Sequence, residues 1–310
     1  MSISINQHQH PLVTIVIPTY NRVDLVQQAV ASVIAQTYSN WELMVVNDGS
    51  DDGTSDAISL LNDPRVIILN LKHKGNIASL RNTGVKHGSG EWLAFLDSDD
   101  IWLPEKLEIQ LFQLLQKEKR WSYGGYELMN QDMQGIPDKA GKFIPMSGWI
   151  IKEVLTTDAS VTIGSLMLER SLFDETGGFN EDAELLFRED YELFIRLALK
   201  AEVLAIPELL VRIREHSGRA TNAFEYGNER TAAVYEYFLR TNPDRQLARI
   251  ASRRMAGALA ESAVARIRRK EYVEAAGRLW KAFFHGLNGR QLFSVVKRGF
   301  TSSSQHRASS

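Results

Sequence analysis

The stretch Phe95-Leu96-Asp97-Ser98-Asp99-Asp100 decides the fold class of this chain of 310 residues. The apolar run over 92–96 is typical of a short buried strand, and three carboxylates follow it directly. Acidic side chains at the carboxyl end of a strand lie where open α/β sheets bind ligands. Carboxylates packed this closely repel one another unless they share a cation or a proton, so we expect Mg²⁺ or Mn²⁺, which prefer oxygen ligands. The alternative is an acidic turn in which Asp100 caps the next helix.

Apolar strand patterns alternate with helix patterns along the first hundred residues. Continuous apolar strands separated by helices are typical of a parallel sheet that is covered on both faces. The sequence therefore predicts a Rossmann-like, mostly parallel α/β sheet whose strand ends meet along one edge. The predicted strands cover 13–17, 43–46, 66–69 and 92–96, and the predicted helices begin at Asp24 or cover 56–61, 77–86, 104–119 and 187–200.

Beyond residue 222 the pattern is almost entirely helical. The predicted helices there cover 225–240, 244–268, 272–284 and 290–297. A single boundary near residue 222 separates this region from the α/β pattern. We therefore predict an N-terminal tail over 1–11, a catalytic α/β domain over 12–221, a helical C-terminal domain over 222–300 and a disordered tail over 301–310.

Composition limits the class of protein. The chain is 44% hydrophobic and 24% charged, as globular proteins are, and its net charge of -2 provides no global field that would recruit nucleic acid. The absence of cysteine excludes disulfides and thiolate zinc sites, which fits a reducing cytosol. We see no secretory signal and no apolar run near the roughly 20 residues that span a bilayer. We expect a cytoplasmic protein that is soluble or peripheral to a membrane.

Polar groups gather at the predicted strand ends. Together they provide an aromatic ring, acceptors for a base and a ribose, a cation for phosphate and carboxylates for a metal, which is what a nucleotide diphosphate requires. Each residue also has a structural interpretation: Tyr20 as a packing residue, Asp48 closing a turn, Asn21 capping a helix and Arg81 in a surface ion pair. The segments are Pro18-Thr19-Tyr20-Asn21-Arg22, Asn47-Asp48-Gly49-Ser50, Leu80-Arg81-Asn82-Thr83-Gly84 and Asp97-Ser98-Asp99-Asp100.

In this order, the segments 16–21, 46–50 and 97–100 resemble the family 2 inverting glycosyltransferases, over about residues 13–216. The resemblance implies a glycosyltransferase A fold, a nucleotide-sugar donor and Mn²⁺ or Mg²⁺. It implies that Tyr20 lies against the base, that Asp48 accepts a hydrogen bond from it, and that a metal binds Asp99 and Asp97, with His216 as a third candidate ligand or a plain surface histidine. The full set of residues implied at the nucleotide is Pro18, Thr19, Tyr20, Asn21, Asp48, Arg81 and Asp97.

Inversion requires a general base that takes the proton of the acceptor hydroxyl. The resemblance implies that Asp190 is this base and that Glu189 supports it; without the resemblance, two acids at a helix start are ordinary, because the helix dipole stabilises them. The turn Gly177-Gly178-Phe179 matches the family's turn near the donor sugar and acceptor. Trp102 is a candidate for contact with a sugar ring, and packing in the core is its equal alternative.

The predicted enzyme moves a hexosyl or N-acetylhexosaminyl group, with UDP as the expected nucleotide, to a glycan or lipid-linked acceptor in polysaccharide synthesis for the cell envelope. A nucleotidyltransferase is disfavoured because Pro18-Thr19-Tyr20 replaces a glycine-rich phosphate loop. A catalytically silent relative that only binds nucleotide sugars is disfavoured because Asp48, Asp97, Asp99 and Asp190 are all present.

The C-terminal helices have two interpretations. One is a packing or oligomerisation domain with a solvated basic face. The other is peripheral docking on the inner face of a membrane, which mixed apolar and basic residues would allow. The residues concerned are Phe283, Phe284, Leu287, Leu292, Phe293, Val295, Val296 and Phe300, with Arg290, Lys297 and Arg298.

Overall fold

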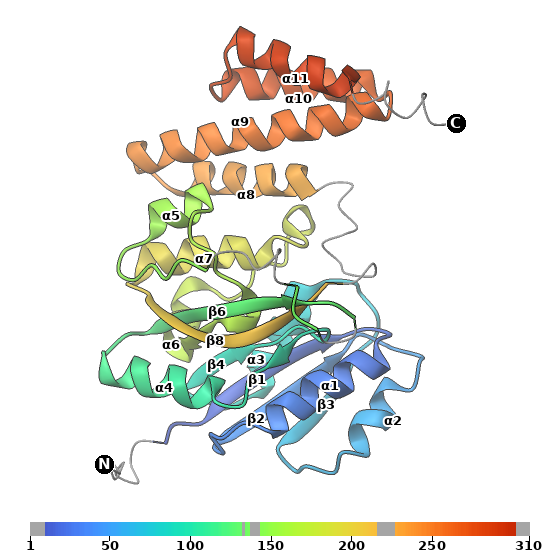
Figure 1. Cartoon of the computed structure of the whole chain (residues 1–310), viewed down its shortest axis with the longest axis vertical. Coiled ribbons are helices and arrows are strands. Elements are labelled where there is room, and N and C mark those ends of the chain that lie inside the picture. The colour runs from blue at the N-terminus through green and yellow to red at the C-terminus, as the bar shows by residue number, and fades with distance from the viewer. Residues whose placement is uncertain (1–9, 132–133, 137–142, 216–226, 302–310) are drawn as a thin grey trace. The chain divides into compact units, whose positions relative to one another are not determined.

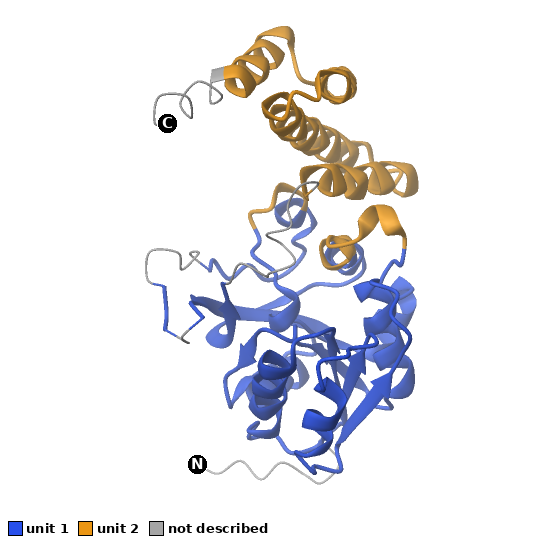
Figure 2. Ribbon diagram, turned by 90° about the vertical axis from the view of Figure 1, so that its right-hand side faces the viewer, with its two compact units in different colours: residues 1–154, 159–181, 193–217 blue, residues 155–158, 182–192, 218–310 orange. Residues whose placement is uncertain are grey.

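A computed structural model of the chain describes residues 10–131, 134–136, 143–215 and 227–301. The chain divides into two compact units (Figure 2). Unit 1 comprises 1–154, 159–181 and 193–217, and unit 2 comprises 155–158, 182–192 and 218–310. The predicted boundary near residue 222 lies outside the described residues. Residues 182–192, which include Glu189 and Asp190, belong to unit 2 although they interrupt unit 1 in the sequence.

The described residues of unit 1 form one eight-stranded sheet in the order β3-β2-β1-β4-β7-β6-β8-β5 (Figure 1). The strands β3, β2, β1 and β4 are parallel, as predicted, and β6 is parallel to β8. Antiparallel pairs join β4 to β7, β7 to β6 and β8 to β5, so the complete sheet is mixed. The strands are β1 Val13–Thr19, β2 Trp41–Asn47, β3 Val66–Asn70, β4 Trp92–Phe95, β5 Ile101–Trp102, β6 Trp121–Met129, β7 Met167–Glu169 and β8 Leu204–Arg214.

Most predicted helices are present within a few residues of their expected bounds. The helix expected from Pro104 begins at Lys106, and the short strand β5 precedes it. Asp100 therefore leads into a strand and does not cap a helix, which corrects that alternative. The helices are α1 Val23–Ile34, α2 Thr54–Ser59, α3 Ile77–His87, α4 Lys106–Gln116, α5 Ile151–Thr156, α6 Arg170–Thr176 and α7 Glu189–Lys200, with 3-10 turns at Ile163–Ser165 and Ala183–Leu185.

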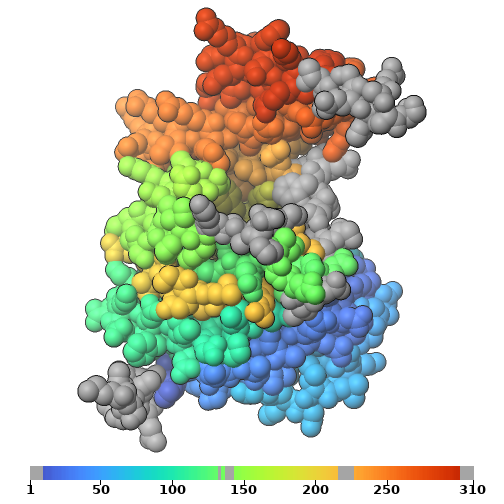
Figure 3. All heavy atoms as spheres, viewed as in Figure 1, coloured from blue at the N-terminus to red at the C-terminus, as the bar shows by residue number. Residues whose placement is uncertain are grey.

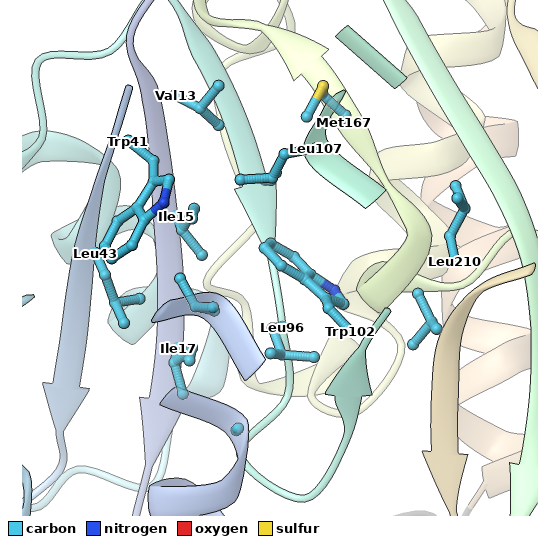
Figure 4. Packing of buried hydrophobic residues seen from close by; sticks show 14 of the residues in the cluster. Val13, Ile15, Ile17, Trp41, Leu43, Leu96, Trp102, Leu107, Met167 and Leu210 are labelled. Atoms are coloured by element: carbon cyan, nitrogen blue, oxygen red, sulfur yellow. The ribbon is translucent and has the colours of Figure 1, made fainter. Parts of the chain in front are cut away.

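Alternate residues of the strands cover opposite faces of the sheet. Ile15 and Ile17 belong to a buried cluster that includes the inner residues of α1 and α4, and Figure 4 shows this cluster from close by. Val16 meets α3 on the opposite face, where a Cβ on Gly84 would lie only 2.4 Å from Val16 Cγ1. A glycine at this position lets α3 pack directly on the strands. Helices on both faces hold the strand ends in fixed positions.

Unit 2 contains the predicted helical region. Helix α9 contacts α8, α10 and α11, and its small apolar residues pack against α10 and α11. No helix among the described residues is long and apolar enough to cross a membrane. The helices are α8 Gly227–Thr241, α9 Arg245–Arg268, α10 Tyr272–Phe284 and α11 Gly289–Thr301.

A network of ionic hydrogen bonds around Glu229 joins three helices of unit 2. The carboxylate of Glu229 on α8 accepts hydrogen bonds from Arg266 Nε at 2.6 Å, from Arg278 Nη2 at 3.2 Å and from Ser262 Oγ at 2.8 Å. Burial by itself raises the pKa of Glu229, but the hydrogen bonds from Arg266, Arg278 and Ser262 outweigh it and lower the pKa from 4.5 to about 2. The charged carboxylate therefore stabilises the folded unit.

We expect Glu229→Gln to lower the free energy of unfolding at pH 7 by roughly 2 kcal/mol, because two arginines lose their common partner. The folded pKa is depressed, so the contribution of Glu229 is present above pH 4.5 and is lost as the pH falls toward about 2. The difference between wild type and variant in urea unfolding should therefore shrink between these pH values. Glu236→Gln on the same helix is the control, because Glu236 meets Lys281 only at 3.8 Å and both side chains are exposed. An unchanged difference across this range would contradict the prediction.

Candidate functional site

The parallel strands bring their carboxyl ends into register. Thr19 of β1 pairs with Asn47 of β2, which pairs with Asn70 of β3, so the loops after these strands begin side by side. The backbone confirms the alignment, since the Asp48 N–H donates to the Thr19 carbonyl oxygen at 2.9 Å. On the other side of β1, the Leu96 N–H donates to the carbonyl oxygen of Val16 at 3.1 Å. The predicted gathering of the strand-end segments along one sheet edge is present in the structure.

Hydrogen bonds connect the first two of these loops. The Asn21 N–H donates to Ser50 Oγ at 2.9 Å, and Asn21 Oδ1 accepts from the Asp51 N–H at 3.0 Å. The start of α1 is bound by Asp52, whose Oδ2 accepts from the Val23 N–H at 2.9 Å. Asp52, and not Asn21, therefore provides the acceptor at this helix start, and Asn21 shapes the loop that holds Tyr20 in position.

Tyr20 and Asp48 come together through a residue that the sequence analysis did not select, His73. The half-exposed Tyr20 ring stacks on the His73 ring with 4.1 Å between centroids and 21° between planes. His73 Nδ1 lies 2.8 Å from Asp48 Oδ2. The sequence could indicate His73 only by its position, because this residue follows β3 and the carboxyl end of β3 lies at the same sheet edge.

Asp48 itself is 1% exposed. Its two carboxylate oxygens accept the N–H groups of Lys74 and Gly75, each at 2.9 Å. A carboxylate offers about four acceptor positions, so these two bonds and the His73 contact leave room for one further donor. Asp48 therefore fixes the loop after β3 and retains the capacity to accept a hydrogen bond from a base.

The three carboxylates after β4 converge. One oxygen from each of Asp97, Asp99 and Asp100 lies within 4.8 Å of the others. Two guanidinium groups offset part of their negative charge: Arg81 Nη2 lies 2.7 Å from Asp97 Oδ1, and Arg22 Nη1 lies 2.7 Å from Asp99 Oδ2. A set of three carboxylates at this spacing fits a hard divalent cation such as Mg²⁺ or Mn²⁺.

Arg214, at the end of β8, holds the acidic loop in place. It is buried; its N–H donates to Asp100 Oδ1 and its Nε donates to the carbonyl oxygen of Asp99, both at 3.0 Å. The sequence did not reveal this contact because Arg214 is far from the acidic segment along the chain. His216, the third predicted metal ligand, lies outside the described residues.

Helix α3 binds the Gly-Gly-Phe turn as well as Asp97. The Asn82 side-chain amide makes two hydrogen bonds to the backbone of Phe179: its Nδ2 donates to the carbonyl oxygen and its Oδ1 accepts from the N–H, each at 2.9 Å. The Phe179 ring is buried among Phe95 and Phe173. The ring is therefore unavailable to a sugar, and only the backbone of Gly177, Gly178 and Phe179 remains a candidate for that contact.

The prediction that Trp102 contacts a sugar ring is wrong. It is 2% exposed, its Nε1 donates to the Gly164 carbonyl oxygen at 2.8 Å, and Lys106 Nζ lies 3.8 Å from its ring centroid. Burial also lowers the pKa of Lys106 well below its usual value. Figure 4 shows Trp102 in the core cluster near Leu96. Trp102 is thus a core residue and does not face a sugar.

The candidate general base lies at the start of α7, as predicted. Glu189 is buried, whereas Asp190 is half-buried and its Oδ1 accepts the Tyr191 N–H at 2.7 Å. The helix is anchored by its buried apolar residues, among them Leu193, Phe194 and Leu197. The more accessible carboxylate is the one predicted to act as the base, and its catalytic role stays a prediction.

Comparisons with known proteins agree on one family. Residues 14–147 match the model of Glycosyl transferase family 2. The chain is 32% identical over 195 residues to the UDP-Glc:alpha-D-GlcNAc-diphosphoundecaprenol beta-1,3-glucosyltransferase WfgD of Escherichia coli. The aligned region covers 63% of this chain and 73% of WfgD.

Two solved structures have the same fold. One is S. aureus TarS 1–349 in complex with UDP-GlcNAc, with a TM-score of 0.65, 16% identity and coverage of 96% of this chain and 91% of TarS. The other is the mannosyltransferase PcManGT of Pyrobaculum calidifontis in complex with GDP-Man and Mn²⁺, with a TM-score of 0.59, 17% identity and coverage of 96% and 88%. With the predicted glycosyltransferase A fold present and a curated relative matched over most of its length, the chain belongs to glycosyl transferase family 2.

Proposed function

We propose that the chain is an inverting, metal-dependent glycosyltransferase that moves a sugar from a UDP-sugar to a hydroxyl of a glycan or lipid-linked acceptor. The observation that carries the proposal is the convergence of the Tyr20 ring, the Asp48 carboxylate and the Asp97-Asp99-Asp100 cluster at one sheet edge. The name of WfgD supports a UDP-sugar donor and a lipid-linked acceptor. The transferred group would be a hexosyl or N-acetylhexosaminyl group, and the product would be an envelope polysaccharide made at the cytoplasmic face of a membrane.

In this mechanism the base of the nucleotide stacks on Tyr20 and donates a hydrogen bond to Asp48. Arg81 fixes the orientation of Asp97 through their 2.7 Å contact. A divalent cation held by Asp97, Asp99 and Asp100 would neutralise charge that develops on the departing diphosphate. Arg22 would then either share the Asp99 carboxylate with that cation or lose its contact with Asp99.

The chain's own acid–base chemistry belongs to Asp190. Its carboxylate would take the proton of the acceptor hydroxyl as the oxygen forms a bond to the anomeric carbon and the bond to the diphosphate breaks. A single displacement of this kind inverts the configuration of that carbon. Glu189 would support Asp190 from the same helix start, and the backbone of residues 177–179 would lie near the sugar.

Calorimetric titration of UDP, GDP and dTDP, with and without Mn²⁺, tests the donor site. We expect UDP to bind more tightly than GDP or dTDP and to require the metal ion. Tyr20→Ala should weaken UDP binding about tenfold or more, because stacking on a base contributes roughly 1–3 kcal/mol. Tyr272→Ala is the matched control, since Tyr272 is a tyrosine of similar exposure, 50% against 42%, in unit 2.

Two outcomes would change the proposal. A folded protein that binds none of the three nucleotides would contradict it. Metal-dependent UDP binding without any transfer to lipid-linked acceptors would instead favour the silent, nucleotide-sugar-binding relative.

A further inference from the structure

Helix α10 has two apolar faces. Ala275 and Ala282 are buried, and Leu279 packs beside them against α9 and α11. A second apolar stripe is exposed: Val273, Trp280 and Phe284 recur at spacings of seven and four residues, which places them on one side of the helix. Their side chains are 82%, 65% and 66% exposed. A single buried face would suffice for packing within the unit, so this second face needs another explanation.

The two aromatic rings of this stripe contact each other and the ring of the neighbouring exposed residue Phe283. The Trp280 ring centroid lies 5.0 Å from that of Phe284 and 6.4 Å from that of Phe283, and the two phenylalanine centroids are 5.9 Å apart. We call Trp280, Phe283 and Phe284 the aromatic surface. The space-filling view shows the atoms of α10 and α11, in red, along the surface of unit 2 (Figure 3). An exposed group of large apolar side chains of this kind marks an interaction site.

The surrounding helices carry a large positive charge. Residues 245–301 contain thirteen lysines and arginines against three glutamates, although the whole chain has a net charge of -2. Helix α11 has no acidic residue, and its exposed Phe293 lies one turn from exposed Arg290 and Lys297 on the helical period. Exposed aromatic rings beside basic side chains are typical of helices that lie in a membrane interface.

We propose that the aromatic surface of α10 and the exposed basic residues Arg290 and Lys297 of α11 dock unit 2 on a bilayer that contains anionic lipids. The rings would enter the boundary between headgroups and acyl chains, and Arg290 and Lys297 would contact lipid phosphates. A second copy of this chain is a poorer occupant, because two surfaces of the same positive charge repel each other. The inference rests on the proposed function only in the role given to docking, which is to bring the enzyme to a lipid-linked acceptor.

The structure also changes the set of C-terminal residues that are available to contact a bilayer. Val295 is buried and Val296 and Leu287 pack in the core of unit 2, so they cannot enter a bilayer. Trp280, which the sequence analysis did not include, is the centre of the exposed cluster. The proposed surface is therefore narrower than the apolar segments of the sequence indicated.

Sedimentation with vesicles tests the proposal. We expect the full chain to bind vesicles of phosphatidylcholine mixed with phosphatidylglycerol, to bind phosphatidylcholine alone much less, and to dissociate at high salt. The variant W280S/F283S/F284S should lower the partition coefficient at least about tenfold, because buried ring surface is lost. Replacing Arg290 with glutamine should lower it about fivefold, as one basic residue near an anionic surface contributes on the order of 1 kcal/mol.

Leu60→Ser is the matched control, because Leu60 is an apolar residue of unit 1 that is 83% exposed. It should leave vesicle binding unchanged. Equal loss in this control, or no binding of the intact chain to anionic vesicles, would overturn the proposal. A dimer that the triple variant dissociates, without vesicle binding, would also overturn it and assign the surface to a second copy.

Titration of UDP with Mn²⁺ separates this inference from the proposed function. The triple variant should bind UDP as the wild type does. Wild-type protein that binds UDP but not anionic vesicles would overturn the docking proposal alone. Wild-type protein that binds anionic vesicles but no nucleotide would support docking and remove the proposed function.

Discussion

Replacing Asp99 with asparagine should abolish metal-dependent UDP binding and lower kcat/KM for sugar transfer by about 10²–10³-fold. Asparagine keeps the volume of the side chain but removes its charge, and hard divalent cations depend on carboxylate ligands. Loss of a cation at the leaving group removes several kcal/mol of stabilisation, and each 1.36 kcal/mol is tenfold in rate. Asp99 also holds Arg22 at 2.7 Å, so a small loss of stability is expected as well.

The control for Asp99→Asn is Asp51→Asn. Asp51 is an exposed carboxylate on the neighbouring loop after β2, and it is not part of the three-carboxylate cluster. Calorimetry measures UDP binding with and without Mn²⁺, and a thermal melt verifies that both variants fold. Transfer by a folded Asp99→Asn variant at the wild-type rate, with the same dependence on Mn²⁺, would show that the cluster does not hold a catalytic cation.

Replacing Asp190 with asparagine should lower kcat by about 10²–10⁴-fold, the usual range for loss of a general base. UDP affinity should remain within about twofold of wild type, which is roughly 0.4 kcal/mol, because Asp190 is proposed to act on the acceptor and not on the nucleotide. This combination distinguishes a catalytic role from damage to the fold.

Two further variants sharpen the test of Asp190. Asp174→Asn changes an exposed carboxylate of α6 and should have no effect on kcat. Glu189→Gln should lower kcat less than Asp190→Asn, since Glu189 is buried and is proposed only to support the base. If Glu189→Gln removed activity while Asp190→Asn did not, the two roles would have to be exchanged.

The strand-end residues were predictable because their positions follow from a simple rule. Apolar strands that alternate with helices form a parallel sheet, and the residues after each strand must then meet at one edge. This rule placed Tyr20, Asp48 and Asp97 correctly relative to their strands, and the register of β1 with β2 and β4 confirms it. The helices of unit 2 were equally predictable, because a periodic apolar pattern is a local property of the sequence.

Contacts between distant segments were not predictable in the same way. Trp102 is followed in sequence by a helix pattern and lies near three aspartates, which made it a candidate for a sugar contact. Only packing decides that its ring enters the core and that its Nε1 donates to Gly164. Similarly, Arg214 reaches Asp99 and Asp100 because β8 pairs with β5, which directly follows these aspartates. No local sequence pattern predicts which distant strands pair.

The sequence by itself determined the family, the parallel half of the sheet, the helical region after residue 227 and the carboxylates that gather after β4, because each follows from local period, strand polarity or a contiguous motif. Tertiary structure alone decided that His73 stacks on Tyr20, that Asp100 precedes a strand and not a helix, that Trp102 is core and that Trp280 is exposed. The physical reason is that exposure and contact depend on which remote segments cover a side chain, and the chain sets those neighbours only when it folds.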